Sequence, residues 1–283
     1  MANILKAINT FNETKITHLI EHYNRVGGNR VTSVGDALER YIQDLFADTL
    51  NESNEEARNL KVSEEFSYKG NTSNPPDCIL KNGDAIEVKK IESSASSLAL
   101  NSSFPKQKLF STDSRITPTC KLCEKWSEKD IIYVIGHVNK KEIKHLWFVY
   151  GSCYCANQST YERIANKITE STNTITDVDF AFTNELARVN KVDPLGITYL
   201  RVRGMWGIEH PSKVFDYIYK RDVSSTIALT CIMTQEKFES FSTEDKNLII
   251  LSNSIKHTKK KIKDPDNPAH LIDAMLITLD IKQ

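Results

Sequence analysis

The chain has 283 residues, of which 40% are hydrophobic, so it can bury a substantial core in one large domain. Its 37 basic and 37 acidic residues give a formal net charge of zero, so the protein as a whole does not attract a polyanion such as nucleic acid. No run approaches the roughly 20 apolar residues that span a bilayer, and residues 1–15 lack the pattern of a signal peptide. We therefore expect a cytoplasmic protein without membrane contact, in which any nucleic-acid surface comes from local clusters.

The first expected element is an amphipathic helix. Apolar side chains recur at helical spacing over residues 34–50, at Val34, Leu38, Ile42, Leu45 and Phe46. The polar stretch that follows should end this helix, and residues 62–68 should then extend toward a sheet. Residues 93–106 are rich in serine and are expected to form a loop or a helix entry.

The later part of the chain predicts further strands and a helix. Residues 130–138 and 145–150 are dense in β-branched and aromatic residues and flank a short polar turn, so they should pair as neighbouring strands. Residues 159–170 are expected to be helical, and residues 197–202 to form a strand. This mixed order favours an α/β or α+β domain with one central sheet.

Two carboxylates and an amine are expected on one hairpin. Asn82-Gly83 lies between two short apolar runs and is a strong hairpin signal. Asp77 begins the first strand, while Glu87 and Lys89 lie two residues apart on the second and therefore project from one face. We predict that Asp77, Glu87 and Lys89 form a catalytic centre.

The register of this hairpin decides whether Asp77 joins the other two residues. A two-residue turn would place Asp77 opposite Val88, on the wrong face. A three-residue loop with a glycine bulge, which pairs Lys81 with Ala85, would place Asp77 opposite Lys89. The catalytic hypothesis therefore predicts the bulged loop.

This set of residues suits the hydrolysis of a phosphodiester. Carboxylate oxygens bind Mg²⁺, which polarises a phosphate and lowers the pKa of a bound water. Asp77 and Glu87 are the expected metal ligands, with the backbone carbonyl of Val88 as a third. Lys89 would orient or deprotonate the attacking water and offset negative charge in the transition state.

The motifs PD at 76–77 and EVK at 87–89 resemble the signature of the PD-(D/E)xK nuclease superfamily. In that superfamily the motifs lie on adjacent strands beside an N-terminal helix. The resemblance implies an α/β fold with a central mixed sheet flanked by helices, and an Mg²⁺ cofactor. It also matches Glu39 to an acidic helix residue that supports the metal site; the alternative for Glu39 is an exposed helix carboxylate.

A closer resemblance covers most of residues 1–220. The segments VGDALERYIQDLF, PPDCILKNGDAIEVKKI, LNSSFPK, HLWFVYGSCYCA and LRVRGMWGIEHP are similar to the NgoPII kind of type II restriction endonuclease, which cuts at GGCC. This resemblance implies a homodimer that cleaves double-stranded DNA at a short palindromic site, and functional pairing with a DNA methyltransferase. It also implies a single domain over 1–283, with a catalytic core at about 30–155 and a DNA-recognition and C-terminal part at about 156–283.

Two segments carry side chains suited to DNA. Arg201 and Arg203 lie two apart on an expected strand, so their guanidinium forks could bind guanine O6 and N7 from one side. Salt-bridged arginines beside a core tryptophan are the alternative there. Trp206 and His210, which follow these arginines, could contact the DNA backbone. The second segment is the loop after the hairpin, which is either a phosphate-binding loop or an ordinary serine-rich loop. Its candidates for contact with the DNA backbone are Asn101, Ser102, Ser103 and Lys106.

Four cysteines and one basic run leave other functions open. Cys120 with Cys123, and Cys153 with Cys155, could bind zinc, or the second pair could lie on a strand as small hydrophobes. The run 256–263 could bind phosphates or form a solvated helix or loop face. The alternatives are a zinc-stabilised, non-catalytic nucleic-acid-binding protein and a repair or recombination nuclease without a strict site. The first leaves the two carboxylates unexplained, because acids repel a polyanion unless a cation lies between them.

Overall fold

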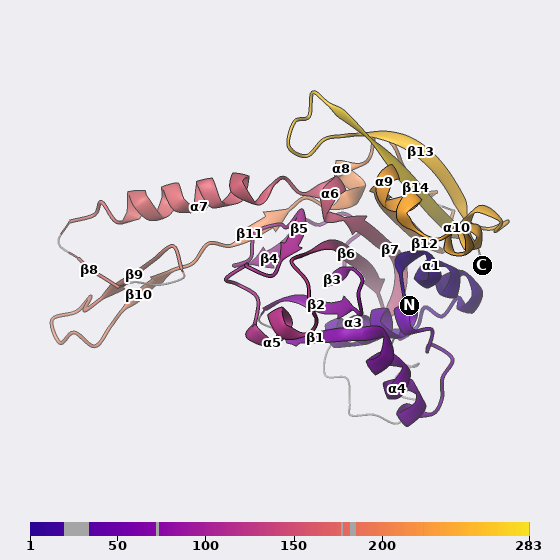
Figure 1. Cartoon of the computed structure of the whole chain (residues 1–283). Helices are drawn as coiled ribbons and strands as arrows, with labels where there is room; N and C mark the ends of the chain where they lie inside the picture. Colours follow the sequence, from indigo (N-terminus) through magenta and orange to yellow (C-terminus); the bar gives the residue numbers. More distant parts are fainter. Residues whose placement is uncertain (20–33, 72–73, 177, 182–184, 223, 283) are drawn as a thin grey trace.

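The computed structural model describes residues 1–19, 34–71, 74–176, 178–181, 185–222 and 224–282. Within these ranges a nine-stranded mixed sheet forms the centre of the molecule (Figure 1), which confirms the expected α/β class. Eight strands follow one another across it: β1 (Phe66–Asn71), β2 (Asn74–Leu80), β3 (Ala85–Ile91), β6 (Glu128–Asn139), β7 (Glu142–Tyr150), β12 (Ile227–Thr234), β14 (Leu271–Ile281) and β13 (Lys256–Lys263). The ninth, β5 (Lys108–Phe110), pairs with β6.

Helices cover both faces of this sheet. Successive strand residues point to opposite sides, so the apolar residues of one strand contribute to a core on each face. Ile86 and Val88 of β3 join the core that packs against one group of helices, and Ala85 and Ile91 join the core on the other face. The first group comprises α1 (Ile4–Thr14), α3 (Val34–Ala47), α4 (Glu55–Glu65), α9 (Gln235–Ser240) and α10 (Thr243–Ile250). The second comprises α5 (Pro118–Leu122), α6 (Gly151–Tyr154) and the end of α8 (Pro211–Val214).

The predicted helix over residues 34–50 is confirmed as α3, but it ends earlier. Asp48 has a left-handed backbone with φ 53°, and its carboxylate accepts a hydrogen bond from Thr10 Oγ1 at 3.1 Å. The expected extended segment over 62–68 begins only at Phe66. Val62 lies in α4, whose first turn is capped by the side chain of Asn54.

The strands expected over 130–138 and 145–150 are confirmed as β6 and β7, which pair in an antiparallel ladder. The expected helix over 159–170 is confirmed as α7 (Gln158–Thr172). The strand expected over 197–202 is limited to β10 (Leu200–Val202). The serine-rich segment contains a strand that periodicity missed, β4 (Leu98–Asn101), because its partner β11 (Trp206–Ile208) comes much later in the chain.

The last sixty residues complete the central sheet through β12, β13 and β14. The basic run 256–263 is β13, so the expectation of a helix or loop face is wrong. Its lysines are mostly exposed on an edge strand while Ile262 is buried, and charged edge strands resist pairing with other chains. Within the described ranges no helix has both the length and the hydropathy needed to cross a membrane.

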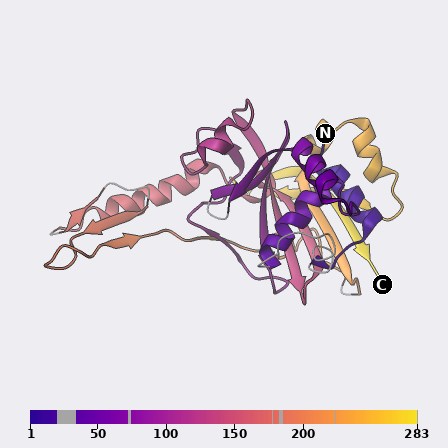
Figure 2. The same ribbon diagram turned by 90° about the horizontal axis from the view of Figure 1, so that it is seen from below.

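One segment leaves the body of the protein. Residues 158–205, which we call the arm, contain α7 and the small sheet formed by β8 (Asp179–Phe180), β9 (Ala187–Asn190) and β10. Two perpendicular views show the arm extending away from the central sheet (Figures 1 and 2). The chain returns to the body at β11, which pairs with β4.

Candidate active site

The β2–β3 hairpin turns through a three-residue loop, as the catalytic hypothesis predicts, but at another position. Leu80 N–H donates to the Asp84 carbonyl at 3.0 Å, so the loop consists of residues 81–83. The predicted pairing of Lys81 across the loop is therefore wrong. Asn82, with φ 54°, takes the left-handed conformation that we expected of a glycine, because a short polar side chain tolerates it.

The changed register still places the predicted residues on one face. The main-chain ladder ends at the pair Cys78–Ile86, and its continuation sets Asp77 across from Glu87 instead of Lys89. The alternation of side chains is preserved, so all three belong to the same face of the hairpin. Beyond the ladder, Asp77 Oδ2 accepts the Val88 N–H at 2.6 Å, so a carboxylate replaces a main-chain acceptor at this point.

Lys89 and Glu87 form an ion pair at the centre of the site. Lys89 Nζ lies 2.6 Å from Glu87 Oε1. Burial lowers the pKa of Lys89, but the carboxylates of Glu87 and Asp77 outweigh burial and raise that pKa above its usual value. In the free protein Lys89 is therefore an ammonium group that donates hydrogen bonds.

Asp77 has an unusual affinity for a proton. Burial and the neighbouring Glu87 raise the pKa of Asp77 to about 8, although Lys89 and the Val88 N–H act in the opposite direction. Two close carboxylates in a poorly solvated site cannot both ionise without a compensating cation. The site therefore favours either a bound proton or a bound cation.

Helix α3 brings Glu39 into the electrostatic field of this site. Burial, and then Asp36, raise the pKa of Glu39, while Lys89 lowers it. Gly136 in β6 permits α3 to pack closely, because a Cβ at that position would lie 2.6 Å from Leu38 Cδ2. Glu39 is thus a partly buried carboxylate beside the hairpin and not a fully exposed helix residue.

The residues present fit a hard divalent cation. Glu87 Oε2 is buried and has no hydrogen-bond partner among the described residues. The Val88 carbonyl faces the same gap as its N–H, because both groups of a strand residue point to one edge, and this N–H points toward Asp77. No three His, Cys, Asp or Glu side chains in the described ranges are grouped around one point, so a cation here would retain several waters.

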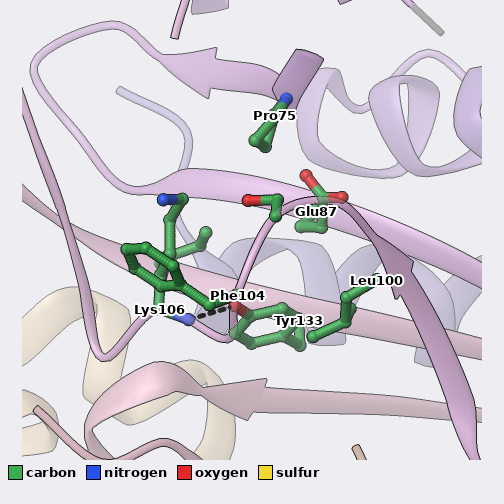
Figure 3. A pocket seen from close by; sticks show the side chains of 8 residues that line it. Pro75, Glu87, Leu100, Phe104, Lys106 and Tyr133 are labelled. Carbon is green, nitrogen blue, oxygen red and sulfur yellow. Dashed lines mark hydrogen bonds between the residues drawn. The ribbon is translucent and has the colours of Figure 1, made fainter. Parts of the chain in front are cut away.

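A small pocket lies directly beside Glu87 (Figure 3). Glu87 and Pro75 form one side, and Phe104, Lys106 and Tyr133 form the other. Tyr133 lies on β6, next to Glu87 in the parallel ladder with β3. Its hydroxyl accepts the Lys106 N–H at 2.7 Å, which fixes the backbone of the segment 101–106 against the sheet.

Lys106 is placed differently from the sequence-based expectation. Its side chain is nearly inaccessible, with only 4% of the residue exposed, and its ammonium group bonds to Asp113. It also lies 4.6 Å from the centre of the Phe104 ring. The expected phosphate partner of Lys106 is thus replaced by a carboxylate within the protein.

The other residues of that loop remain at the surface. Asn101 has φ 53° and lies at the end of β4, across from Trp206 of β11. Ser102 is exposed and its carbonyl accepts a bond from Arg115, whereas Ser103 is partly buried and lines the pocket. These three residues therefore flank the pocket beside Glu87.

Arg201 and Arg203 are exposed and share one acidic partner. Arg201 Nε donates to Glu185 Oε2 at 2.7 Å, and Arg203 Nε donates to Glu185 Oε1. Both arginines lie in or next to β10, in the part of the arm away from the catalytic hairpin (Figure 1). In the free protein this matches the salt-bridged alternative of the sequence analysis.

Trp206 and His210 contribute to packing. Trp206 is partly buried, and its ring centre lies 5.7 Å from that of Tyr161. His210 is only 1% exposed, and its Nδ1 accepts the Ser212 N–H at 3.0 Å, which caps α8. Burial lowers the pKa of His210 to about 4, so it is a neutral buried cap. The expected contact of His210 with DNA is therefore not compatible with its burial.

The cysteines do not gather into a metal site. Cys120 lies in α5 and Cys123 follows it, whereas Cys153 and Cys155 lie in and after α6. The CYC segment is thus a helical turn and not the strand that we considered. Burial raises the pKa of Cys153 to about 12, so this residue is a thiol packed as a small apolar group. All six cysteines are free.

Sequence reasoning missed three residues that shape the pocket. Tyr133, Phe104 and Asp113 hold or line the segment that faces Glu87. Tyr133 was recognisable only as part of a strand, because the pairing of β3 with β6 is not encoded in either segment alone. Phe104 lies in the loop from which Asn101, Ser102, Ser103 and Lys106 were chosen for their polar chemistry, so an apolar neighbour was passed over. Asp113 lies in a segment without regular periodicity, and nothing in its sequence neighbourhood indicates the pocket.

Comparisons with known proteins identify the family of this chain. Residues 2–264 match the model of the NgoPII restriction endonuclease family. The chain is 50% identical over 279 residues to the type II restriction enzyme NgoPII of Neisseria gonorrhoeae, which covers 98% of this chain and 99% of that protein. No solved structure gives a significant match. The chain belongs to the NgoPII restriction endonuclease family.

Proposed function

We propose that this chain hydrolyses phosphodiester bonds of double-stranded DNA at a short palindromic, GC-rich site, with Mg²⁺ held by Asp77, Glu87 and the Val88 carbonyl. One observation carries the assignment of the centre: a buried oxygen of Glu87, without a hydrogen-bond partner among the residues that the structure describes, lies beside Lys89 where the hairpin ladder opens. The relative's designation as a type II restriction enzyme supports DNA as the substrate.

The charges of the site suit this reaction. When bound, Mg²⁺ would polarise the scissile phosphate and lower the pKa of a coordinated water. Asp77 would give up its proton if a cation were bound, because a cation would offset the repulsion between Asp77 and Glu87. The Glu87 oxygen that has no partner among the described residues is available to a cation, while its other oxygen accepts from Lys89.

Lys89 provides the positive charge on the protein side of the reaction. Its ammonium group would orient the attacking water and offset the charge that develops on phosphate oxygens. A cation beside it would also lower its pKa, which would let it accept a proton. Glu39, which feels the charges of Lys89 and Glu87, would support the same centre from α3.

DNA contacts outside the centre are assigned by chemistry and position. Asn101, Ser102 and Ser103 flank the pocket beside Glu87 and would hold the DNA backbone. Arg201 and Arg203 would exchange Glu185 for guanine, since their forks fit guanine O6 and N7. The family resemblance further supports a homodimer and functional pairing with a DNA methyltransferase. The expected place of action is the cytoplasm.

The test uses the purified protein and plasmid DNA, with Mg²⁺ or with EDTA, followed by sequencing of the cut ends. We expect discrete Mg²⁺-dependent fragments whose ends share a short palindrome. Asp77→Asn, Glu87→Gln and Lys89→Ala should each reduce cleavage by at least about a hundredfold, while DNA binding in Ca²⁺ or EDTA persists.

A surface ion pair supplies the matched control. Lys108 Nζ lies 2.6 Å from Glu128 Oε1, the same separation as in the active centre, but 38% and 50% of these two side chains are exposed, against 24% and 12% for Lys89 and Glu87. Lys108→Ala should therefore cleave at the wild-type rate. Wild-type cleavage by Lys89→Ala would reject the proposed centre. Ends without a common sequence would instead favour the repair-nuclease alternative, and intact DNA with stoichiometric zinc the non-catalytic one.

A further inference from the structure

The arm, residues 158–205, has almost no core of its own. Helix α7 contains no buried residue, and Ala187 is the single buried residue among those the structure describes in the arm. A helix of 15 residues is marginal in water without tertiary packing, and small sheets likewise need a packed face. The arm therefore lacks the packing partner that its elements require.

The arm also concentrates exposed apolar side chains. Of the 18 large hydrophobic residues that are exposed in the described ranges, ten lie in this short segment, with exposed fractions between 39% and 80%. Ile164 and Ile168 are four apart on α7 and share one face of the helix. The ten residues are Ile164, Ile168, Ile175, Val178, Val192, Leu195, Ile197, Tyr199, Leu200 and Met205.

The apolar side of the arm suits a protein partner better than DNA. Arg201 and Arg203, the proposed guanine contacts, alternate with Leu200 and Val202 along β10 and therefore point to the other face of that strand. The sequence of residues 158–205 contains six acidic and six basic residues, a net charge of zero. A surface that binds mainly phosphates needs an excess of positive charge, which this segment lacks. Balanced charges around apolar side chains instead suit an isologous contact, in which the same surface meets itself about a two-fold axis.

The base of the arm is fixed to the active centre. Phe104 stacks on Tyr161 of α7 with ring centres 5.8 Å apart, and it meets Trp206, next to the other end of the arm, edge-on at 6.2 Å. Phe104 also lines the pocket beside Glu87. A body that docks on the arm is therefore held in a set direction relative to the catalytic hairpin.

We infer that the arm is the surface on which a second copy of this chain docks. The ten apolar residues together expose on the order of 1,000 Å², which is comparable to the roughly 800 Å² that one partner contributes to an ordinary stable interface. The inference rests on the proposed function, because a palindromic duplex site presents one equivalent scissile bond on each strand, which two symmetry-related active centres would address. Paired arms anchored beside each Glu87 would hold the two centres on one duplex.

The experiment measures oligomeric state for the full-length protein by light scattering coupled to size exclusion, across the micromolar range. The wild type should have twice the chain mass of 32.2 kDa. Ile164→Glu with Ile168→Glu places two charges on the apolar face and should weaken dimerisation by at least about tenfold. Ile250→Glu on α10 is the matched control, since Ile250 is 43% exposed, between the 39% of Ile164 and the 46% of Ile168.

The outcomes separate this inference from the proposed function. A wild type that is monomeric yet cuts plasmid rejects the arm as an interface and leaves the nuclease intact; a dimer that never cuts does the reverse. A double variant that dimerises normally but loses DNA affinity also rejects the inference, because the apolar face of α7 would then contact DNA and not a second copy. Hydrogen exchange of the wild type provides a readout without substitutions: α7 amides should gain protection at dimer-forming concentrations, and unchanged exchange contradicts the interface.

Discussion

Replacing Asp77 by Asn should stabilise the metal-free protein while it abolishes cleavage. Burial and Glu87 raise the pKa of Asp77 from 3.8 to about 8. Between these two values the folded protein keeps a proton that the unfolded chain has lost. Wild-type stability therefore falls by about 1.4 kcal/mol per pH unit as pH rises through this interval, and it levels off above the folded pKa.

The asparagine variant lacks this penalty because an amide does not ionise. Its side-chain oxygen can still accept the Val88 N–H, so the local hydrogen bond is kept. The variant and the wild type should have similar stability at about pH 4 and should differ by on the order of 4 kcal/mol at about pH 7. The variant is the more stable of the two throughout this interval.

Urea unfolding in EDTA at a series of pH values measures this difference. Asp216→Asn, at an exposed carboxylate, is the control and should follow the wild type. Addition of Mg²⁺ should stabilise the wild type but not Asp77→Asn, because the variant has lost a ligand. Parallel pH profiles for the wild type and Asp77→Asn in EDTA would refute the reasoning about the carboxylate pair.

Three further outcomes follow from the same geometry. Mg²⁺ affinity, measured by calorimetry, should increase up to about pH 8, because the ion competes with the proton on Asp77; a flat profile contradicts this. Gly136→Ala should lower stability by about 1 to 3 kcal/mol, because its Cβ would meet the buried Leu38 side chain, and an unchanged melting temperature would show that α3 yields freely. Lys237→Met should cost about 3 kcal/mol of unfolding free energy, because Lys237 Nζ bonds to both Asp84 and Asp130, at 2.6 and 2.8 Å. A smaller loss at acidic pH, where these carboxylates bind protons, would support that cause, and an equal loss would contradict it.

The catalytic hairpin illustrates what local sequence can predict. The two-residue spacing of Glu87 and Lys89 determines that they share a face, and the turn signal at Asn82-Gly83 predicts a hairpin that returns Asp77 toward them. The register was wrong by one position on each strand because Asn82, not Gly83, adopts the left-handed backbone. The face was still right, since a displacement by one residue on both strands keeps the alternation.

Other site residues depended on contacts that no local pattern contains. Lys106 and His210 have side chains that suit DNA, yet the fold buries one against Asp113 and uses the other to cap α8. The sequence gives the chemistry of each side chain, but the accessibility of that side chain depends on segments from distant parts of the chain that pack against it. Tyr133 entered the site for the same reason, through the parallel pairing of β3 with β6.

The sequence by itself determined the local elements and the chemical character of the centre, because side-chain periodicity and turn preferences act over a few residues. The tertiary structure alone decided that Glu39 approaches Lys89, that β4 pairs with the distant β11, and that an apolar arm stands outside the core. Each of these depends on pairing between segments far apart in the chain. Such pairing is selected by the packing of the whole sheet and its helices and not by the residues of any one segment.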